Sequence, residues 1–217
     1  MNVLIIDGHP DEGRLLGALL DHYEKTLAGA VSVTRLAVRD LSFDPVLHRG
    51  YAGDQPWEPD LERVAEALDA CDHLVFGFPL WWGAEPAAVK GLLDRLLLPG
   101  FTFRYHREDL LWDRLLTGRS ADVIITMDTP PWYLRWVYGD PVTRRLKYQV
   151  LGFCGIRPLR FFKLGATRRG GAARKLDHWM REIGRAAASA GGLKRDSRRN
   201  ILPGRERFAE AIRERQS

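Results

Sequence analysis

Residues 73–100 read HLVFGFPLWWGAEPAAVKGLLDRLLLPG and contain a strand pattern followed at once by a helix pattern. The run from His73 to Phe78 is almost wholly apolar and stops at Pro79, which is typical of a buried strand. Residues 86–98 have helical spacing, with Pro86 in the first turn and Pro99-Gly100 directly after the end. A strand that leads into a helix of this length predicts a parallel sheet, because a helical crossover returns the chain to the same edge.

The same alternation is found on both sides of this stretch. We predict strands at residues 2–7, 31–36, 121–127 and 159–164, and helices at 13–28, 60–70, 141–153 and 171–190. Residues 40–59 form a long polar segment that is predicted to be a loop, and a Trp- and Pro-rich loop is predicted after residue 127. Five strands with intervening helices predict a doubly wound α/β domain over residues 1–190, with helices on both faces and the flavodoxin-like strand order 2-1-3-4-5.

Composition narrows the class of protein. The chain has 217 residues, of which 45% are hydrophobic and 28% charged, so it is not disordered throughout. Its apolar runs are only a few residues long, whereas a membrane span needs about 20. Asp7 and His9 interrupt the N-terminal apolar run too early for a secretory signal. Cys71 and Cys154 are far apart and outside any CxxC pattern, so we expect two buried thiols in a cytoplasmic protein.

Charge is concentrated at the C-terminus. The formal net charge is +5, and residues 194–217 contain eight Lys or Arg and four Asp or Glu, so +4 of the +5 lies there. A nucleic-acid-binding surface should cover a face of the folded domain, and we therefore expect no nucleic-acid partner. Residues 191–217 are predicted to be a solvated basic tail.

Three loops should carry the chemistry, because ligands of open parallel sheets bind beyond the carboxyl ends of the strands. The loop after the first strand contains His9 and Arg14 and leads into a helix, which is a typical anion site. It matches neither GxGxxG nor GxxxxGK[ST]. The loop after the third strand contains Trp81 and Trp82; neighbours in an extended segment point in opposite directions, so at least one should line the crevice.

The third loop, after the fourth strand, is also aromatic, with Trp132 and Tyr133 close to its start. An apolar, aromatic crevice with few charges favours a flat redox ligand over a sugar or a phosphoester. Hydrolase chemistry finds no support, because no GxSxG motif exists. The six histidines lack ligand spacing, and no metal site is expected.

Several motifs together resemble the flavodoxin-like NAD(P)H:quinone oxidoreductases, the relatives of DT-diaphorase that include the modulator-of-drug-activity type. The resemblance covers most of residues 1–190. Its most specific part is residues 78–82 (FPLWW), followed by Pro86, Lys90-Gly91, Asp94-Arg95 and residues 99–101 (PGF). Residues 8–10 (GHP), 43–45 (FDP) and 153–155 (FCG) also match.

This resemblance implies a noncovalent flavin, reduced by NAD(P)H and reoxidised by a quinone-like acceptor in a two-electron ping-pong cycle. It also implies a homodimer in which the partner subunit covers the acceptor site. FMN is favoured over FAD, because the chain is short and the relatives' Ser-Phe-Asn-like stretch is replaced by Arg14, Leu15 and Leu16. By the resemblance, His9 and Arg14 contact the flavin phosphate and Tyr133 is the candidate catalytic residue. The expected flavin contacts along the ring are Pro79, Leu80, Trp81, Trp82, Gly83, Thr126, Met127, Asp128 and Thr129.

Two alternative functions belong to classes other than enzymes. One is an ancillary regulatory subunit that docks an acidic partner or a membrane surface through Lys194, Arg195, Arg198 and Arg199. The other is a flavodoxin-like electron carrier, which would use one-electron chemistry.

Overall fold

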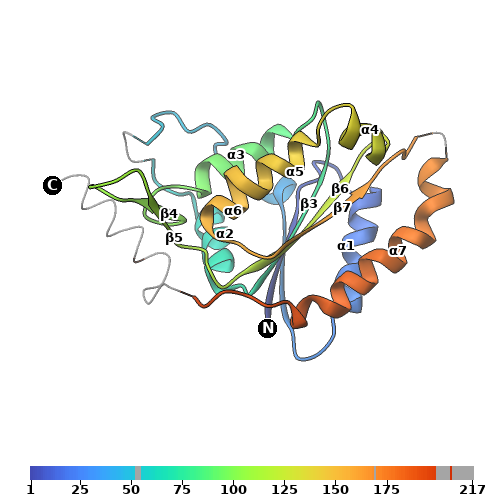
Figure 1. The fold of residues 1–217 in the computed structure, drawn as a ribbon, viewed down its shortest axis with the longest axis horizontal. Coiled ribbons are helices and arrows are strands. Elements are labelled where there is room, and N and C mark those ends of the chain that lie inside the picture. The colour runs from blue at the N-terminus through green and yellow to red at the C-terminus, as the bar shows by residue number, and fades with distance from the viewer. Residues whose placement is uncertain (52–54, 169, 199–205, 207–217) are drawn as a thin grey trace.

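The five predicted strands form one parallel sheet in the computed structural model, which describes residues 1–51, 55–168, 170–198 and 206. In sheet order these are β2 (Ser32–Ala37), β1 (Asn2–Asp7), β3 (His73–Pro79), β6 (Ser120–Thr126) and β7 (Leu159–Leu164). This arrangement confirms the predicted order 2-1-3-4-5, since β6 and β7 are the fourth and fifth strands of the sheet along the chain. All four pairings are parallel, and the strands run upward to one edge in Figure 1.

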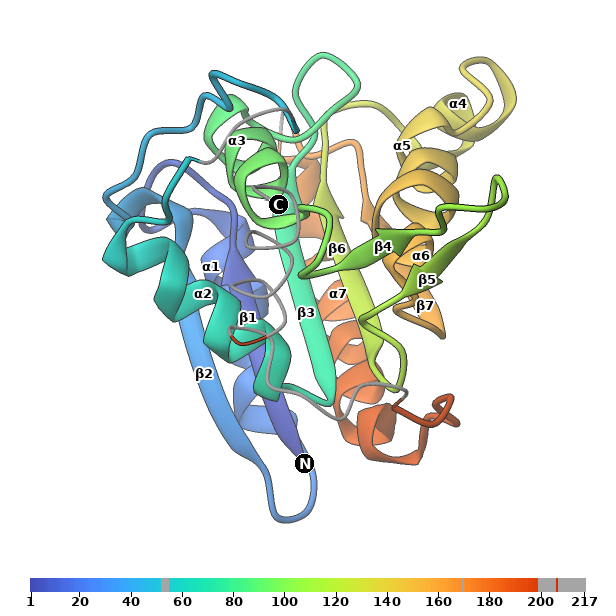
Figure 2. The same ribbon diagram turned by 90° about the vertical axis from the view of Figure 1, so that its left-hand side faces the viewer.

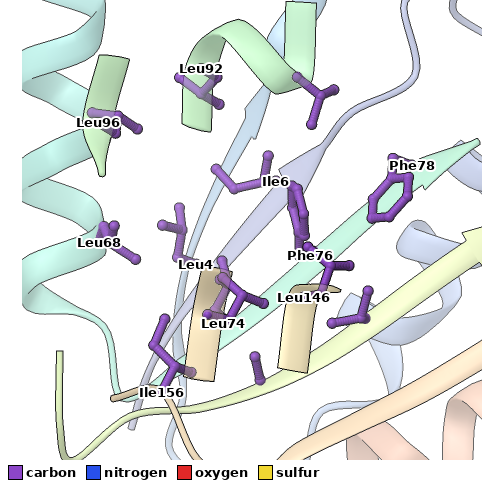
Figure 3. Packing of buried hydrophobic residues seen from close by; sticks show 14 of the residues in the cluster. Leu4, Ile6, Leu68, Leu74, Phe76, Phe78, Leu92, Leu96, Leu146 and Ile156 are labelled. Carbon is purple, nitrogen blue, oxygen red and sulfur yellow. The ribbon is translucent and has the colours of Figure 1, made fainter. Parts of the chain in front are cut away.

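Helices cover both faces of the sheet, as Figures 1 and 2 show. One layer consists of α1 (Leu15–Thr26) and α7 (Gly171–Ser189). The other consists of α2 (Pro59–Ala70), α3 (Ala87–Leu96), α5 (Pro141–Arg145) and α6 (Leu151–Cys154). Alternate residues of β1 therefore enter different clusters: Val3 and Ile5 pack under the first layer, and Leu4 and Ile6 under the second. Figure 3 shows the second cluster, where Leu74, Phe76 and Phe78 of β3 meet side chains from the covering helices.

Between Thr102 and Gly155 the structure differs from the sequence prediction in three places. A hairpin of β4 (Phe103–Tyr105) and β5 (Trp112–Arg114) occupies a segment for which no element was predicted, because its strands are only three residues long. The segment predicted as a loop after residue 127 contains α4 (Pro131–Trp136), with a proline at its first position. The helix predicted at 141–153 is present, but a π-helical segment (Leu146–Val150) joins α5 to α6.

The long loop after β2 begins with a 3₁₀ turn (Val38–Asp40) and is clamped onto α3. Arg95 is fully buried and donates hydrogen bonds to the carbonyl of Pro56 at 2.9 Å and to Glu58 Oε2 at 2.9 Å. Gly91 allows Pro45 to approach, because a Cβ at residue 91 would lie 2.4 Å from the Pro45 Cβ. Gly91 and Arg95 of the Lys90-Gly91 and Asp94-Arg95 motif therefore hold this loop against the helix, whereas Lys90 and Asp94 pair with each other at 2.6 Å on the exposed side.

A buried polar network ties the lower end of the sheet together. Asp122 accepts hydrogen bonds from Tyr23 Oη at 2.6 Å and from Arg160 Nε at 2.6 Å. His73 bridges Tyr23 at 2.9 Å and Ser120 at 2.8 Å. Each of these polar side chains thus has a hydrogen-bonding partner, and polar groups can be buried without a large loss of stability only under that condition.

The described part of the basic tail contacts the domain. Arg195 Nε donates to Ser120 Oγ at 2.9 Å, and Arg198 donates to the carbonyl of Cys71 at 2.6 Å and to Asp72 Oδ1 at 2.9 Å. Two of the four cations that the docking alternative assigned to an external partner are therefore engaged within the chain. Arg199 and most of the residues after it lie outside the described residues, and the domain boundary at residue 190 stays a prediction.

Both thiols are free and buried, as expected. Burial raises the pKa of Cys71 to about 11 and that of Cys154 to about 12, so neither is a nucleophile at neutral pH. In the part of the chain that the structure describes, no helix has the length and apolar character needed to cross a membrane.

Candidate active site

A cleft of about 250 Å³ lies at the carboxyl ends of the strands. Four loops supply its walls: those after β1, β3, β6 and β7. Among the predicted site residues, the cleft is lined by His9, Arg14, Leu15, Leu16, Pro79, Leu80, Trp81, Thr126, Met127 and Asp128. Thr167 and Ala172 complete the lining. Residues that are up to 163 positions apart in the sequence thus meet because their strands end at the same edge of the sheet.

The loop after β1 is held tightly before it enters the cleft. Buried Asp7 accepts a hydrogen bond from the backbone N–H of His9 at 3.1 Å and from Arg39 Nη1 at 2.8 Å. The N–H of Gly8 donates to the Gly77 carbonyl of β3 at 2.7 Å. A Cβ at residue 8 would lie 2.7 Å from that same carbonyl oxygen, so only glycine allows this approach.

His9 presents a hydrogen-bond donor to the cleft. Its Nδ1 accepts the backbone N–H of Asp11 at 3.0 Å, which places the proton of the neutral ring on Nε2. Partial burial lowers the pKa of His9, and the nearby Arg14 acts in the same direction. The imidazole is therefore neutral at physiological pH and offers its Nε2–H as a donor.

The N-terminus of α1 forms the positive end of the cleft. Within the described residues no side chain caps this helix, and its first turn contains no acidic residue. Its first backbone N–H groups are unpaired within the helix and carry the positive end of the helix dipole. Arg14, at the N-cap position, forms an ion pair with Asp11, and both side chains are more than half exposed. Leu15 and Leu16 follow and line the cleft, so at these two positions the side chains offer neither a hydroxyl nor an amide group.

The loop after β3 places one tryptophan in the cleft and the other in solvent. Trp81 and Ala84 exchange backbone hydrogen bonds of 2.8 and 3.0 Å around a two-residue turn. Trp82 and Gly83 form that turn with φ angles of 52° and 84°. Trp81 consequently lies against the cleft, with its ring 6.2 Å from that of His9, while Trp82 at the tip is fully exposed. The prediction that at least one of the pair lines the crevice is confirmed for Trp81.

Asp128 is neutralised by a loop that the sequence interpretation did not inspect. Its Oδ1 accepts a hydrogen bond from Thr167 Oγ1 at 2.6 Å, and its Oδ2 pairs with Arg168 Nε at 2.6 Å. Both carboxylate oxygens therefore have a partner, and the ion pair is exposed to solvent, with side-chain exposures of 82% for Arg168 and 47% for Asp128. Thr167 and Arg168 follow β7, which is the neighbour of β6 in the sheet, and this adjacency was the signal that could have identified them.

Four predicted site residues do not line the cleft: Trp82, Gly83, Thr129 and Tyr133. Tyr133 lies on α4 and packs edge-to-face on Tyr138 with ring centroids 5.1 Å apart. Among the described residues, no group of three or more His, Cys, Asp or Glu could hold a metal ion.

The cleft therefore combines an anion site at the N-terminus of α1 with an apolar and aromatic wall formed by Pro79, Leu80 and Trp81. Its polar edge is formed by the end of β6. These features suit a flat aromatic group that carries a phosphate.

Comparisons with known proteins agree with this architecture. A family model described as "flavodoxin-like fold" matches residues 1–186. The FMN-dependent NADH:quinone oxidoreductase of Azotobacter vinelandii is 27% identical over 187 residues, which cover 78% of this chain and 89% of that protein. The NAD(P)H dehydrogenase [quinone] 1 of Rattus norvegicus is 26% identical over 140 residues; the match covers 58% of this chain and only 47% of the rat enzyme.

Solved structures show the same fold. Smu.1420 from Streptococcus mutans superposes with a TM-score of 0.73 at 26% identity, over 86% of this chain and 98% of that one. The NAD(P)H:quinone oxidoreductase from Methanothermobacter marburgensis superposes with a TM-score of 0.71 at 20% identity, over 89% and 98% of the two chains. The family model, the relatives and the five-stranded sheet together confirm the resemblance seen in the motifs: this chain belongs to the family of proteins with the flavodoxin-like fold that includes the NAD(P)H:quinone oxidoreductases.

Proposed function

We propose that this protein is a flavin-dependent NAD(P)H oxidoreductase that passes two electrons to a quinone-like acceptor. The observation that carries the proposal is the pairing of an uncapped helix N-terminus with the Trp81 wall in one cleft. Relatives named FMN-dependent NADH:quinone oxidoreductase support the activity, and one similar solved structure is that of an FMN-dependent NADH-azoreductase from Bacillus anthracis in complex with FMN.

FMN is the proposed cofactor, with NAD(P)H as the co-substrate. The phosphate would bind at the N-terminus of α1, where the backbone N–H groups of Leu15 and Leu16, the Nε2–H of His9 and the Arg14 guanidinium can all donate to it. This set needs no hydroxyl or amide side chain. FAD remains the alternative cofactor.

The flavin, once bound, supplies hydride transfer, and the protein stacks, orients and shields it. Pro79, Leu80 and Trp81 would exclude water from one side of the ring. Thr126, Met127 and Asp128 would contact its polar edge, with Asp128 as acceptor for a ring N–H while Thr167 and Arg168 balance its charge. Thr129 lies outside the lining of the cleft, and its proposed contact with the flavin would require the ring to extend beyond that lining. Trp82 and Gly83 would act by fixing the turn that positions Trp81.

Tyr133 is the proposed catalytic side chain. It lies half-buried in α4, four residues after Thr129 and outside the lining of the cleft, and we propose that its phenol donates a hydrogen bond to the acceptor oxygen. Its tight packing on Tyr138 and on Trp132 gives it a defined position.

Three further features complete the proposal. Residues 1–190 form the flavin-binding domain and 191–217 the basic tail. A second copy of the chain pairs with the first to cover the acceptor site. The cytoplasm is the proposed location, which agrees with two unpaired buried thiols.

The first experiment is an absorption spectrum of the purified protein, followed by anaerobic addition of NADPH or NADH. We expect flavin bands that are bleached by a nicotinamide donor and restored by a water-soluble benzoquinone, and FMN after acid release. A protein that takes up neither FMN nor FAD would refute the proposal. Flavin that accumulates in a stable one-electron form during reductive titration would favour the electron-carrier alternative.

A further inference from the structure

A cluster of exposed aromatic side chains lies beside the candidate site, on α4 and the turn after it. Trp132 is 62% exposed, Trp136 74%, Val137 54% and Tyr138 59%. Single exposed apolar residues are ordinary, but four within seven consecutive positions form a patch that calls for a partner. Tyr148, beyond α5, is also 59% exposed.

The patch is held rigidly. Leu134 is buried in the core, and the backbone N–H of Tyr138 donates a hydrogen bond to the Tyr133 carbonyl. Trp132 and Trp136 are four positions apart and therefore share one face of the helix, which points away from the core side occupied by Leu134. The aromatic rings are thus presented outward by a fixed backbone.

Two cations lie over aromatic rings of this segment. Arg135 lies over the Trp136 ring at 5.0 Å, and Lys147 lies over the Tyr148 ring at 5.4 Å. Arg144 is exposed on α5 and lies between Arg135 and Lys147 in the sequence. Residues 130–148 contain four Lys or Arg and one Asp. Arg145 pairs with buried Glu85, and Asp140 pairs with Lys163, so the positive charge of this surface comes from Arg135, Arg144 and Lys147.

We propose that this surface, defined by Trp132, Arg135, Trp136, Val137, Tyr138, Arg144 and Lys147, docks the protein on an anionic lipid bilayer. Tryptophan and tyrosine prefer the interface between headgroups and acyl chains, and neighbouring cations are attracted to anionic lipids. The second copy that is proposed to cover the acceptor site would not be centred on this patch. In a two-fold interface the patch would face itself, so that the three cations would meet their equivalents.

The position of the patch connects it to the proposed function, on which this part of the inference rests. The patch begins six residues after Thr126, the last residue of β6. In Figure 1, α4 lies at the upper edge of the sheet, where β6 and β3 end. Docking by this edge would turn the mouth of the cleft toward the bilayer. A lipophilic quinone could then reach the site without crossing water.

The test measures co-sedimentation of the full chain with vesicles of phosphatidylcholine alone or mixed with phosphatidylglycerol, with no quinone or nicotinamide present. We expect binding to the mixed vesicles that is weakened by salt and nearly absent with phosphatidylcholine alone. The double variant Trp132→Ser/Trp136→Ser should lower the partition coefficient at least about tenfold. Arg144→Gln should lower it about fivefold, which corresponds to about 1 kcal/mol.

Leu110→Ser is the matched control, because Leu110 is 96% exposed in the β4–β5 connection and lies outside the patch. It should bind as the wild type does. All variants should keep the wild-type thermal midpoint, and Arg144→Gln and Leu110→Ser should also keep the wild-type turnover with a water-soluble quinone. Because vesicle binding needs neither flavin nor turnover, its loss and a failure of the proposed activity are separate outcomes.

Absence of binding to the mixed vesicles would overturn the inference. Binding that the tryptophan substitutions leave unchanged would also overturn it, and would assign lipid affinity to another basic segment such as the tail. A dimer, seen by sedimentation velocity, that dissociates in the tryptophan variant while no vesicle binding occurs would assign the patch to a second copy of the chain.

Discussion

Gly8→Ala is expected to destabilise the protein although it adds only one methyl group. The new Cβ would lie 2.7 Å from the Gly77 carbonyl oxygen, 2.8 Å from Val89 Cγ2 and 3.1 Å from Phe78 Cβ. Ordinary contacts between such atoms are about 3.5 Å, so at least two are too short by about 0.7 Å. Backbone of β3 cannot rotate away as a flexible side chain would, and the loop after β1 must shift instead.

The cost of that shift follows from two contributions. Overpacking a core position by one methyl group typically costs about 1–3 kcal/mol. Movement of the loop also weakens the 2.7 Å hydrogen bond from the Gly8 N–H to the Gly77 carbonyl, which is worth about 1 kcal/mol. We therefore expect the free energy of unfolding to fall by about 2–4 kcal/mol.

Gly17→Ala provides the matched control, since Gly17 lies within α1 and an added Cβ meets nothing within 4 Å. The same methyl group there should stabilise the protein by about 1 kcal/mol through helix propensity. Urea denaturation of both flavin-free variants, followed by far-ultraviolet circular dichroism, measures the two effects. The reasoning is refuted if Gly8→Ala keeps the wild-type midpoint and slope.

Three further predictions concern the site, the buried network and the tight turn. His9→Ala should raise the dissociation constant of FMN about tenfold, because one donor to the phosphate is lost, and should change the rate of hydride transfer little at saturating FMN. His178→Ala, at an exposed histidine, is the control. Slower hydride transfer with an unchanged FMN affinity would contradict the role of His9 in phosphate binding. Burial alone would raise the pKa of Asp122, but hydrogen bonds from His73 and Arg160 lower it below its ordinary 3.8. The stabilisation by ionised Asp122 is therefore complete above about pH 4 and is lost as the pH falls through the lower folded pKa. Asp122→Asn should lower the free energy of unfolding by about 3 kcal/mol at pH 7, and in urea titrations its stability should fall less steeply than that of the wild type as the pH is lowered below about 4. An equally steep fall in both proteins would argue against this assignment. Trp82→Asn should raise the free energy of unfolding by about 1 kcal/mol, because Trp82 is fully exposed at a φ of 52° that asparagine tolerates better. An unchanged or lower midpoint of thermal unfolding would show that the indole makes stabilising contacts.

The strands and principal helices could be predicted from sequence because their signals are local. The apolar run at 73–78 and the helical spacing after Pro86 do not depend on distant residues, and the structure places β3 at His73–Pro79 and α3 at Ala87–Leu96. Elements held by distant contacts were missed. The three-residue strands β4 and β5 have too few residues to show a period, and the six-residue α4 is hidden among prolines and aromatics.

The candidate site likewise has a part that could be predicted from the sequence and a part that could not. Loops after the first, third and fourth predicted strands could be chosen in advance, because the carboxyl ends of parallel strands meet at one edge. The partners of Asp128 could not, since Thr167 and Arg168 reach it only through the pairing of β7 with β6. The two tryptophans were equivalent in sequence, and the tight turn at Trp82 and Gly83 alone decided that Trp81 faces the cleft.

What the sequence by itself determined is the set of parallel strands, their covering helices and the family motifs, because side-chain periodicity and proline or glycine positions act over a few residues. Tertiary structure decided the rest: which Asp7 and Asp128 oxygens are neutralised, which nitrogen of His9 carries its proton, and which aromatic side chains stay in solvent. Each of these depends on distances between residues far apart in the chain. Such distances exist only once the sheet has brought the loops together.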